Sequence, residues 1–175
     1  FLPALWDGGP GEDYALPVWV HYSVGPDNNT YLCLKHMKDT NCPICEEREK
    51  MQKSGDVDGA KSLAASRRYM IWLINRAKEV DGPMIWSMPW TIDRDVALLR
   101  EDQRTGEILQ IHEPEEGFDI DFTRQGSDVK TQYLGLKIAH RPSPLHDDPE
   151  VQDGWLEFVA DHTIPECLNF YDYAY

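Results

Sequence analysis

Residues 21–45, HYSVGPDNNTYLCLKHMKDTNCPIC, contain three of the four cysteines and two of the six histidines of a 175-residue chain. Cys42 and Cys45 form a C-x-x-C turn, and Cys33 precedes it by nine positions. Such a turn holds two sulfur atoms about 3.5–4 Å apart, as a tetrahedral zinc ion with Zn–S bonds of about 2.3 Å requires. A structural zinc ion takes four nitrogen or sulfur ligands. The stretch therefore predicts a structural zinc site that braces the surrounding domain.

The fourth ligand of this site is a histidine, and the spacing allows two. His21 lies on a predicted strand whose hairpin partner carries Cys33, so its ring can reach across the hairpin. His36 forms a Cys-x-x-His pair with Cys33, but only five residues then remain before Cys42. Spacing alone leaves both histidines open, with a slight preference for His21.

A C-P-x-C sequence is also typical of thiol oxidoreductases, in which it follows a strand and opens a helix within a βαβ unit. Here a predicted antiparallel hairpin precedes the motif, and Cys33 has no role in that chemistry. A second alternative is that the thiols pack as small apolar side chains. The polar residues 39–41 argue against this alternative. Zinc is therefore the favoured interpretation.

The composition suits one well-packed domain, with 41% hydrophobic and 11% aromatic residues. No apolar run approaches the roughly 20 residues that span a bilayer, and the sequence does not open on a signal segment. Crowded cysteines suit metal binding in a reducing compartment better than disulfides. We therefore expect a soluble, cytoplasmic protein with no membrane partner.

The charge distribution bears on nucleic-acid binding. The net charge of −14 excludes a generally basic, adhesive protein. Residues 146–175 hold eight acidic residues and no Lys or Arg, which leaves 17 basic and 23 acidic residues in 1–145. A local basic groove therefore remains compatible with the sequence.

Hydrophobic patterns and turn residues predict an α+β fold that is mainly antiparallel β. We expect an arm at 1–15, a core at 16–145 with a zinc-ribbon subdomain inserted at about 18–56, and an acidic C-terminal segment at 146–175. The core is expected to be an OB-fold-like barrel with flanking helices. Strands are predicted at 16–23, 30–34, 67–76, 83–88, 118–124 and 130–140, with a further short one at 108–111, and helices at 43–54, 56–66, from 91 or 93 to about 101, and 149–160.

The strand predicted at 67–76, RRYMIWLINR, combines cations with aromatic rings. Alternation places Arg68, Trp72 and Arg76 on one face and Arg67 and Tyr69 on the other. Cations that follow phosphates and rings that stack on unpaired bases are how proteins hold single-stranded nucleic acid. The alternative is a barrel strand with a core tryptophan, and for this strand taken alone the alternative is favoured.

Other aromatic residues lie on neighbouring predicted strands or at their ends, with Arg94, Arg124, Lys130 and Lys137 nearby in sequence. A cleft lined by several of these rings would suit single-stranded DNA. The candidate DNA-binding residues are Arg67, Arg68, Tyr69, Trp72, Arg76, Lys78, Trp86, Trp90 and Tyr133. Phe122 is a further aromatic residue on a neighbouring predicted strand. The chain contains no G-x-S-x-G, no glycine-rich phosphate loop and no H-E-x-x-H, so we expect no enzymatic activity.

The order of these features across residues 16–145 resembles the single-stranded DNA-binding proteins of T-even bacteriophages and their relatives. The most specific part of the resemblance is the H-C-C-C order of His21, Cys33, Cys42 and Cys45. Because the histidine precedes the first cysteine in that family, the resemblance favours His21 over His36. It implies an OB-fold core with an inserted zinc subdomain and a basic, aromatic cleft for single-stranded DNA. It also implies an acidic C-terminal segment that contacts replication partners and competes for the cleft.

Two functions follow as hypotheses. The first is a non-enzymatic phage protein that coats single-stranded DNA in replication, recombination and repair, in the cytoplasm of the infected host, with a structural zinc ion. The second is a zinc-ribbon adaptor whose acidic surface docks a basic protein. The side-chain directions on the 67–76 strand discriminate between them, because burial of both Tyr69 and Trp72, together with the absence of a basic cleft, favours the adaptor. A thiol oxidoreductase is a third, weaker hypothesis.

Overall fold

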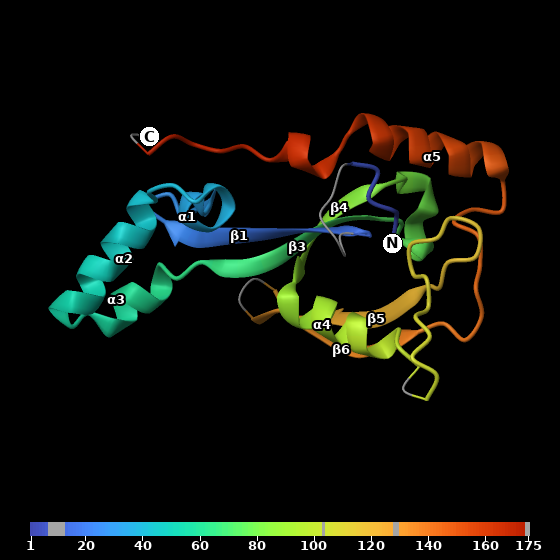
Figure 1. The fold of residues 1–175 in the computed structure, drawn as a ribbon, viewed down its shortest axis with the longest axis horizontal. Coiled ribbons are helices and arrows are strands. Elements are labelled where there is room, and N and C mark those ends of the chain that lie inside the picture. Colours follow the sequence, from blue (N-terminus) through green and yellow to red (C-terminus); the bar gives the residue numbers. More distant parts are fainter. Residues whose placement is uncertain (7–12, 103, 128–129, 174–175) are drawn as a thin grey trace. The chain divides into compact units, whose positions relative to one another are not determined.

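A computed structural model describes residues 1–6, 13–102, 104–127 and 130–173. The chain divides into two compact units, and most of its helices and strands are labelled in Figure 1. Unit 1 comprises Phe1–Leu16 and Tyr69–Pro165, and unit 2 comprises Pro17–Arg68 and Glu166–Tyr175. Within the described ranges, none of the helices combines the length and the apolar character needed to cross a membrane.

The strands form two sheets in a fold that is α+β and mainly antiparallel, as predicted. One sheet has the strand order β2-β1-β3-β4, and β5 and β6 form an antiparallel pair. Strands β1 and β3 each contain a boundary between the units. The strand bounds are β1 Ala15–Val24, β2 Asn29–Leu32, β3 Ser66–Leu73, β4 Met84–Pro89, β5 Ile120–Gln125 and β6 Gln132–Ile138.

Unit 2 carries three helices, α1 Leu34–Lys38, α2 Pro43–Ser54 and α3 Val57–Ser62. Helix α2 begins on a proline, whose missing N–H costs nothing at a helix start, and ends at Gly55, whose φ of 89° suits a left-handed cap. The Asp56 side chain caps α3 by accepting a hydrogen bond from the Gly59 N–H. Helix α1 was not predicted, and α3 is shorter than the predicted 56–66.

Unit 1 carries α4 Trp90–Leu99, α5 Pro149–Asp161 and the 3₁₀ turn η1 Arg76–Asp81. A second 3₁₀ turn, η3 Ile164–Cys167, contains the boundary between the units after Pro165. The strand predicted at 67–76 ends at Leu73 because the Asn75 side chain accepts a hydrogen bond from the Ala77 N–H and caps η1. The short strand predicted at 108–111 is reduced to one isolated bridge between Glu101 and Ile108. Helix α5 confirms the prediction at 149–160.

Unit 1 contains two hydrophobic clusters that share strand β3. Ile71 belongs to the first cluster, and Trp72 belongs to the second. Because adjacent residues of a strand point to opposite faces, β3 carries core side chains on both faces. The second cluster also includes Val159 and Ile164, so the predicted acidic segment 146–175 contributes to the core of unit 1.

Part of the predicted arm 1–15 also packs into unit 1. Leu2 is fully buried in the second cluster, and its backbone N–H donates to the Trp72 carbonyl at 3.0 Å. Strand β1 begins at Ala15, one residue earlier than predicted. Residues 7–12 of the arm lie outside the described residues.

Candidate metal centre and candidate nucleic-acid interface

Four buried side chains of unit 2 bring their metal-ligating atoms together. The Nε2 atom of His21 and the sulfur atoms of Cys33, Cys42 and Cys45 belong to a group whose ligand atoms all lie within 4.8 Å of one another. The sulfur atoms of Cys33 and Cys45 are 3.5 Å apart, and His21 Nε2 is 3.6 Å from the sulfurs of Cys42 and Cys45. These separations are compatible with a tetrahedral zinc ion.

Local structure explains how the four side chains converge. His21 lies on β1 and is paired with Tyr31 of β2, and Cys33 follows β2 directly as the N-cap of α1. Cys42 is the N-cap of α2, and Cys45 lies in the first turn of that helix. The hairpin and the two helix starts therefore each deliver ligands to one point.

The imidazole of His21 is held in the tautomer that a metal requires. Its Nδ1 atom lies 2.8 Å from the Leu63 carbonyl oxygen, so Nδ1 carries the proton and donates it. The Nε2 lone pair is then left for a metal, in the arrangement that orients most histidine ligands. His36 instead stacks on Trp19, with ring centroids 4.4 Å apart. The geometry thus selects His21 over His36.

Burial sets the protonation of the site in the absence of a metal. It raises the pKa of the Cys45 thiol to about 12, raises the pKa of Cys33, and lowers the pKa of His21. Burial also acts to raise the pKa of Cys42, but hydrogen bonds from the Cys45 backbone and side chain and from neighbouring backbone groups bring it below its ordinary value. A metal must therefore displace protons from Cys33 and Cys45 when it binds.

A cation lies close to this centre. Arg48 follows Cys45 by three positions on α2, so both residues lie on one side of the helix. The Nε atom of Arg48 is buried without a hydrogen-bond partner, and its charge lowers the pKa of His21. A zinc ion with three thiolates and a neutral imidazole would carry a net charge of −1, which this guanidinium would offset.

The ligand set also bears on chemistry. All four positions of a tetrahedral ion are supplied by protein side chains, as in structural sites, whereas catalytic sites keep one position open. The Cys33 sulfur lies close enough to the Cys45 sulfur for both to bind one metal ion. In a dithiol enzyme that used only Cys42 and Cys45, Cys33 would have no role. The arrangement is suited to bracing the unit.

The candidate DNA-binding residue Trp72 lies in the core. Its side chain is 6% exposed, and its indole N–H donates to the His162 carbonyl at 3.1 Å. The ring also makes an edge contact with Phe158 of α5. Trp72 is therefore a core tryptophan, which is the alternative stated above for this strand. Its burial gives no support to base stacking on this ring.

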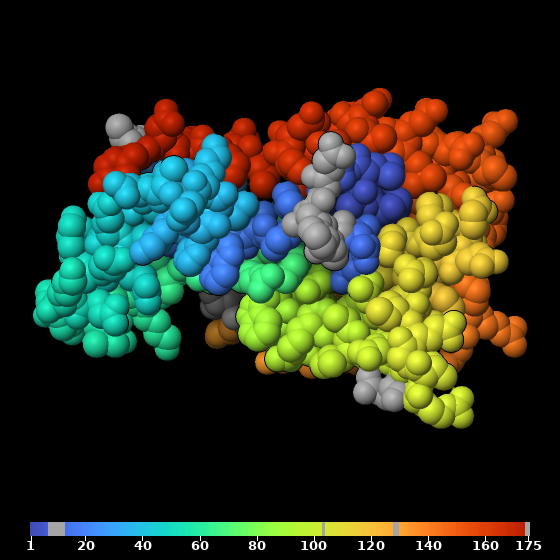
Figure 2. All heavy atoms as spheres, in the orientation of Figure 1, coloured from blue at the N-terminus to red at the C-terminus, as the bar shows by residue number. Residues whose placement is uncertain are grey.

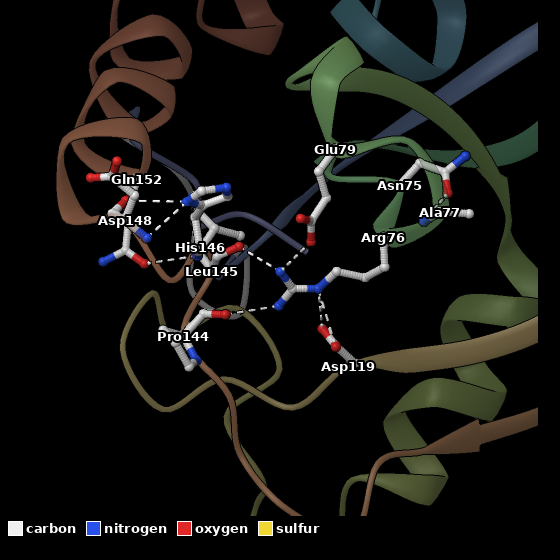
Figure 3. Close-up of polar contacts among 10 residues, drawn as sticks. All are labelled: Asn75, Arg76, Ala77, Glu79, Asp119, Pro144, Leu145, His146, Asp148 and Gln152. Atoms are coloured by element: carbon white, nitrogen blue, oxygen red, sulfur yellow. Dashed lines mark hydrogen bonds and ion pairs between the residues drawn. The ribbon is translucent and has the colours of Figure 1, made fainter.

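The guanidinium of Arg76 is held by groups of unit 1 (Figure 3). Its Nε donates to both carboxylate oxygens of Asp119 at 3.0 and 3.1 Å, and its Nη1 pairs with Glu79 at 3.0 Å. Its terminal nitrogens also donate to the backbone carbonyls of Pro144 and Leu145. With its donors engaged in this way, Arg76 fixes loops of unit 1 and is a poor candidate for a phosphate contact.

Four further candidates come from the strand predicted at 67–76 and the two residues after it, and they are divided between the units. Arg67 is exposed and Arg68 half-buried at the start of β3, in unit 2. Tyr69 is half-buried and packs against the first cluster of unit 1. Lys78 is exposed within η1. These four residues do not form a cluster within either unit.

Three half-buried rings from three strands of unit 1 do form a cluster. Trp86 of β4 stacks on Phe122 of β5, with ring centroids 5.2 Å apart and planes 20° apart. Tyr133 of β6 lies 5.4 Å from Trp86 and 5.5 Å from Phe122. We refer to Trp86, Phe122 and Tyr133 as the aromatic cluster.

The β5–β6 hairpin places a cation beside this cluster. Arg124 is the cross-strand partner of Tyr133, so the two side chains share a face. Alternation places Ile120, Phe122 and Arg124 of β5 on the same face. Ile120 packs against the first cluster, whereas Arg124 is exposed. Lys137 lies on the other face, where it pairs with Asp121 at 3.4 Å.

Trp90, at the start of α4, is the most exposed aromatic candidate. Its side chain is 47% exposed, and the guanidinium carbon of Arg94 lies 5.2 Å from the ring centroid. Arg94 also pairs with Asp95 at 2.7 Å. The ring is thus accessible on a helix surface, with a cation beside it.

Two contributors to these sites were not predicted. The Leu63 carbonyl orients His21, and no side-chain pattern can signal a backbone acceptor 42 positions away. Arg48 follows Cys45 at helical spacing, and that spacing was the available signal. In comparisons with known proteins, no family model matches this sequence, and no curated protein matches it either.

Proposed function

We propose that this protein binds single-stranded DNA through basic and aromatic side chains of an OB-fold-like core, with a zinc ion as a structural brace. In this proposal the protein coats DNA in phage replication and recombination. The observation that carries it is the aromatic cluster, whose rings lie beside Arg124 on one face of the β5–β6 hairpin. Rings that stack on unpaired bases next to a cation that meets phosphate are the usual means of binding a single strand.

Within unit 1, this proposal relies on residues outside the strand predicted at 67–76. Tyr133 and Trp90 are the rings best placed to meet a base, with Arg124 and Arg94 as their nearby cations. Trp86 and Phe122 support Tyr133 from neighbouring strands. Arg67 and Arg68 of unit 2 are retained as separate candidate phosphate contacts because both are basic residues near the start of β3.

Zinc has a structural role in this proposal. His21, Cys33, Cys42 and Cys45 would hold the ion, which would contribute folding free energy to unit 2. The ion would then fix the hairpin β1–β2 against the starts of α1 and α2. The order of these ligands, together with the Arg-Arg-Tyr sequence that begins β3, is what resembles the phage family.

The test is a titration of zinc-loaded protein with oligo-dT, monitored by tryptophan fluorescence at several salt concentrations. Binding should quench the fluorescence and weaken steeply with salt, because phosphate contacts release counterions. Tyr133→Ala should cost about 1–3 kcal/mol of binding free energy. Arg124→Gln should reduce the slope of log K against log salt by about 0.7, the value for one phosphate of a single strand.

Lys137→Gln is the matched control, because Lys137 lies on the same hairpin but pairs with Asp121 on the other face. It should leave affinity and salt slope near the wild-type values. The absence of binding at a salt concentration of about 50 mM, or binding that does not respond to salt, would refute the proposal. Equal effects of Arg124→Gln and Lys137→Gln would refute the assigned face.

A second candidate function, a zinc-ribbon adaptor for a basic protein, has one specific observation in its favour. Trp72 is buried and Tyr69 is half-buried, so β3 offers less aromatic surface than its sequence indicates. An adaptor would bind basic peptides and would ignore oligo-dT. The titration above therefore separates the two functions.

A further inference from the structure

The segment after η3 packs against the rest of unit 2 through aromatic side chains. The Lys38 ammonium lies 3.9 Å from the centroid of the Phe170 ring, and Tyr171 makes an edge contact with Tyr31 at 5.4 Å. The Tyr173 hydroxyl donates to the Glu46 carboxylate at 2.6 Å. In Figure 2 this segment, in dark red, lies against the cyan atoms of unit 2.

A half-open cavity of about 240 Å³ lies between this segment, the β1–β2 turn and the C-x-x-C turn. A single water needs only roughly 10–15 Å³ of such space, so the cavity is large enough to admit a side chain. Its wall includes Ile44 and Pro43 at the start of α2. The cavity lies wholly within unit 2.

The lining of this cavity combines aromatic rings with carboxylates. The rings are those of Tyr31, Tyr171 and Tyr173, and the carboxylates are those of Asp27 and Asp172. The described residues that line it include no Lys, Arg or His. Aromatic rings attract cations through their quadrupole, and carboxylates attract them through their charge. An anion such as phosphate would be repelled by the same lining.

A contact on the same segment pairs an aromatic ring with a cation. The Lys38 ammonium of α1 lies over the face of Phe170. Lys38 and Phe170 line a second hollow, and Tyr171, Asp172 and Tyr173 line both hollows. The cavity next to Tyr31 offers tyrosine rings together with two carboxylates.

We propose that this cavity, which we term the tyrosine cavity, binds an arginine side chain from a basic segment of a partner protein. The guanidinium would lie against the tyrosine rings and donate hydrogen bonds to Asp27 and Asp172. Arginine suits the site better than lysine because its planar group both stacks on rings and pairs with carboxylates. This inference goes beyond DNA binding and does not depend on it.

The experiment uses zinc-loaded full-length protein with ¹³C-labelled tyrosine and an NMR titration. The probe is the peptide acetyl-Gly-Ser-Arg-Ser-Gly-amide, with a second peptide in which neutral citrulline replaces arginine. The arginine peptide should shift the resonances of the three cavity tyrosines and leave the other five unchanged. It should bind at least about tenfold more tightly than the citrulline peptide, since both ion pairing and cation–π attraction require the charge.

The variant Asp27→Asn combined with Asp172→Asn should weaken the arginine peptide about tenfold, since charge-assisted hydrogen bonds are roughly twice as strong as neutral ones. Both residues are exposed, and at the turn position of Asp27 Asn is as suitable as Asp, so the fold and the bound zinc should be retained. Asp153→Asn, an exposed acid on α5, is the matched control and should change nothing. Tyr133→Ala should lower oligo-dT binding and leave the peptide shifts unchanged.

Four results would overturn the inference. Equal binding of the arginine and citrulline peptides would remove the role of charge. Unchanged binding by the double Asn variant, or shifts that Asp153→Asn abolishes, would place the peptide elsewhere. Spermidine that produces the same shifts at lower concentration than the arginine peptide would identify the occupant as a polyamine.

Discussion

The two units of this protein are stabilised by different means. Unit 1 has two hydrophobic clusters built from several strands and helices, whereas the buried cluster of unit 2 consists of three cysteines with half-buried neighbours such as Trp19 and Ile44. A unit of about 60 residues buries a modest share of its apolar surface, and domains of this size are often supported by a bound metal. The difference leads us to expect that unit 1 depends mainly on apolar burial and that unit 2 depends on a metal bound by its cysteines.

Removal of a metal ligand should have the largest effect and should be confined to unit 2. We expect Cys42→Ser to abolish zinc binding and unfold unit 2, because structural zinc supplies about 10–16 kcal/mol of apparent binding free energy in small domains. Zinc content and amide hydrogen exchange resolved by unit measure this. His36→Gln is the control and should keep the zinc, since His36 stacks on Trp19 outside the ligand set. Loss of zinc from His36→Gln would overturn the assignment of His21.

A cavity in the core of unit 1 should produce the opposite pattern. Ile71 is fully buried in the first cluster, and Ile71→Ala should lower the free energy of unfolding by about 2–5 kcal/mol while the zinc stays bound. Denaturant unfolding monitored by tryptophan fluorescence measures the change. Val80 is 95% exposed, so Val80→Ala should stay within about 0.5 kcal/mol of the wild type. Release of zinc by Ile71→Ala would show that zinc binding in unit 2 depends on the stability of unit 1.

Loss of the Arg76 contacts should have a smaller effect on unit 1. Arg76→Met removes the ion pair with Asp119 and the hydrogen bonds to two backbone carbonyls, and should cost about 1–3 kcal/mol of stability. The salt dependence of oligo-dT binding should remain unchanged, because the guanidinium serves the fold. Arg141→Met, at an exposed position, is the control for stability. If Arg76→Met reduced the slope of log K against log salt for oligo-dT binding, Arg76 would again be a candidate DNA-binding residue.

The smallest expected effect is a pH dependence located in unit 1. Burial lowers the pKa of His112 below its ordinary value of 6.5, and the charge of Arg100 acts in the same direction, while Asp13 and Glu113 oppose it. The unfolded chain therefore binds a proton at a higher pH than the folded chain does. The free energy of unfolding should fall as the pH falls below about 6.5, and this loss should be reduced in His112→Gln. An identical pH profile in the variant would contradict the assignment.

Helices α2 and α5 could be predicted from the sequence because their signals are local. Each begins with a proline at its first position, and α2 ends at a glycine with positive φ. The 3₁₀ turn η1 was missed because its start depends on one side-chain hydrogen bond from Ala77 to Asn75, which apolar alternation does not reveal. Helix α1 was missed because it is a single five-residue turn with no buried residue.

The sequence by itself indicated the three cysteine ligands of the candidate metal centre, because Cys42 and Cys45 are three positions apart and Cys33 lies on the predicted hairpin that precedes them. Spacing left His21 and His36 open, and the structure places His21 among the four ligand atoms. Only the tertiary structure decided which side chains of β3 are buried. Val159 and Ile164 lie nearly a hundred residues after Trp72 and pack in the same cluster. The carboxylate of Asp119 accepts a hydrogen bond from the Arg76 guanidinium. Alternation along a strand fixes which residues share a face, but the segments that cover that face come from distant parts of the chain.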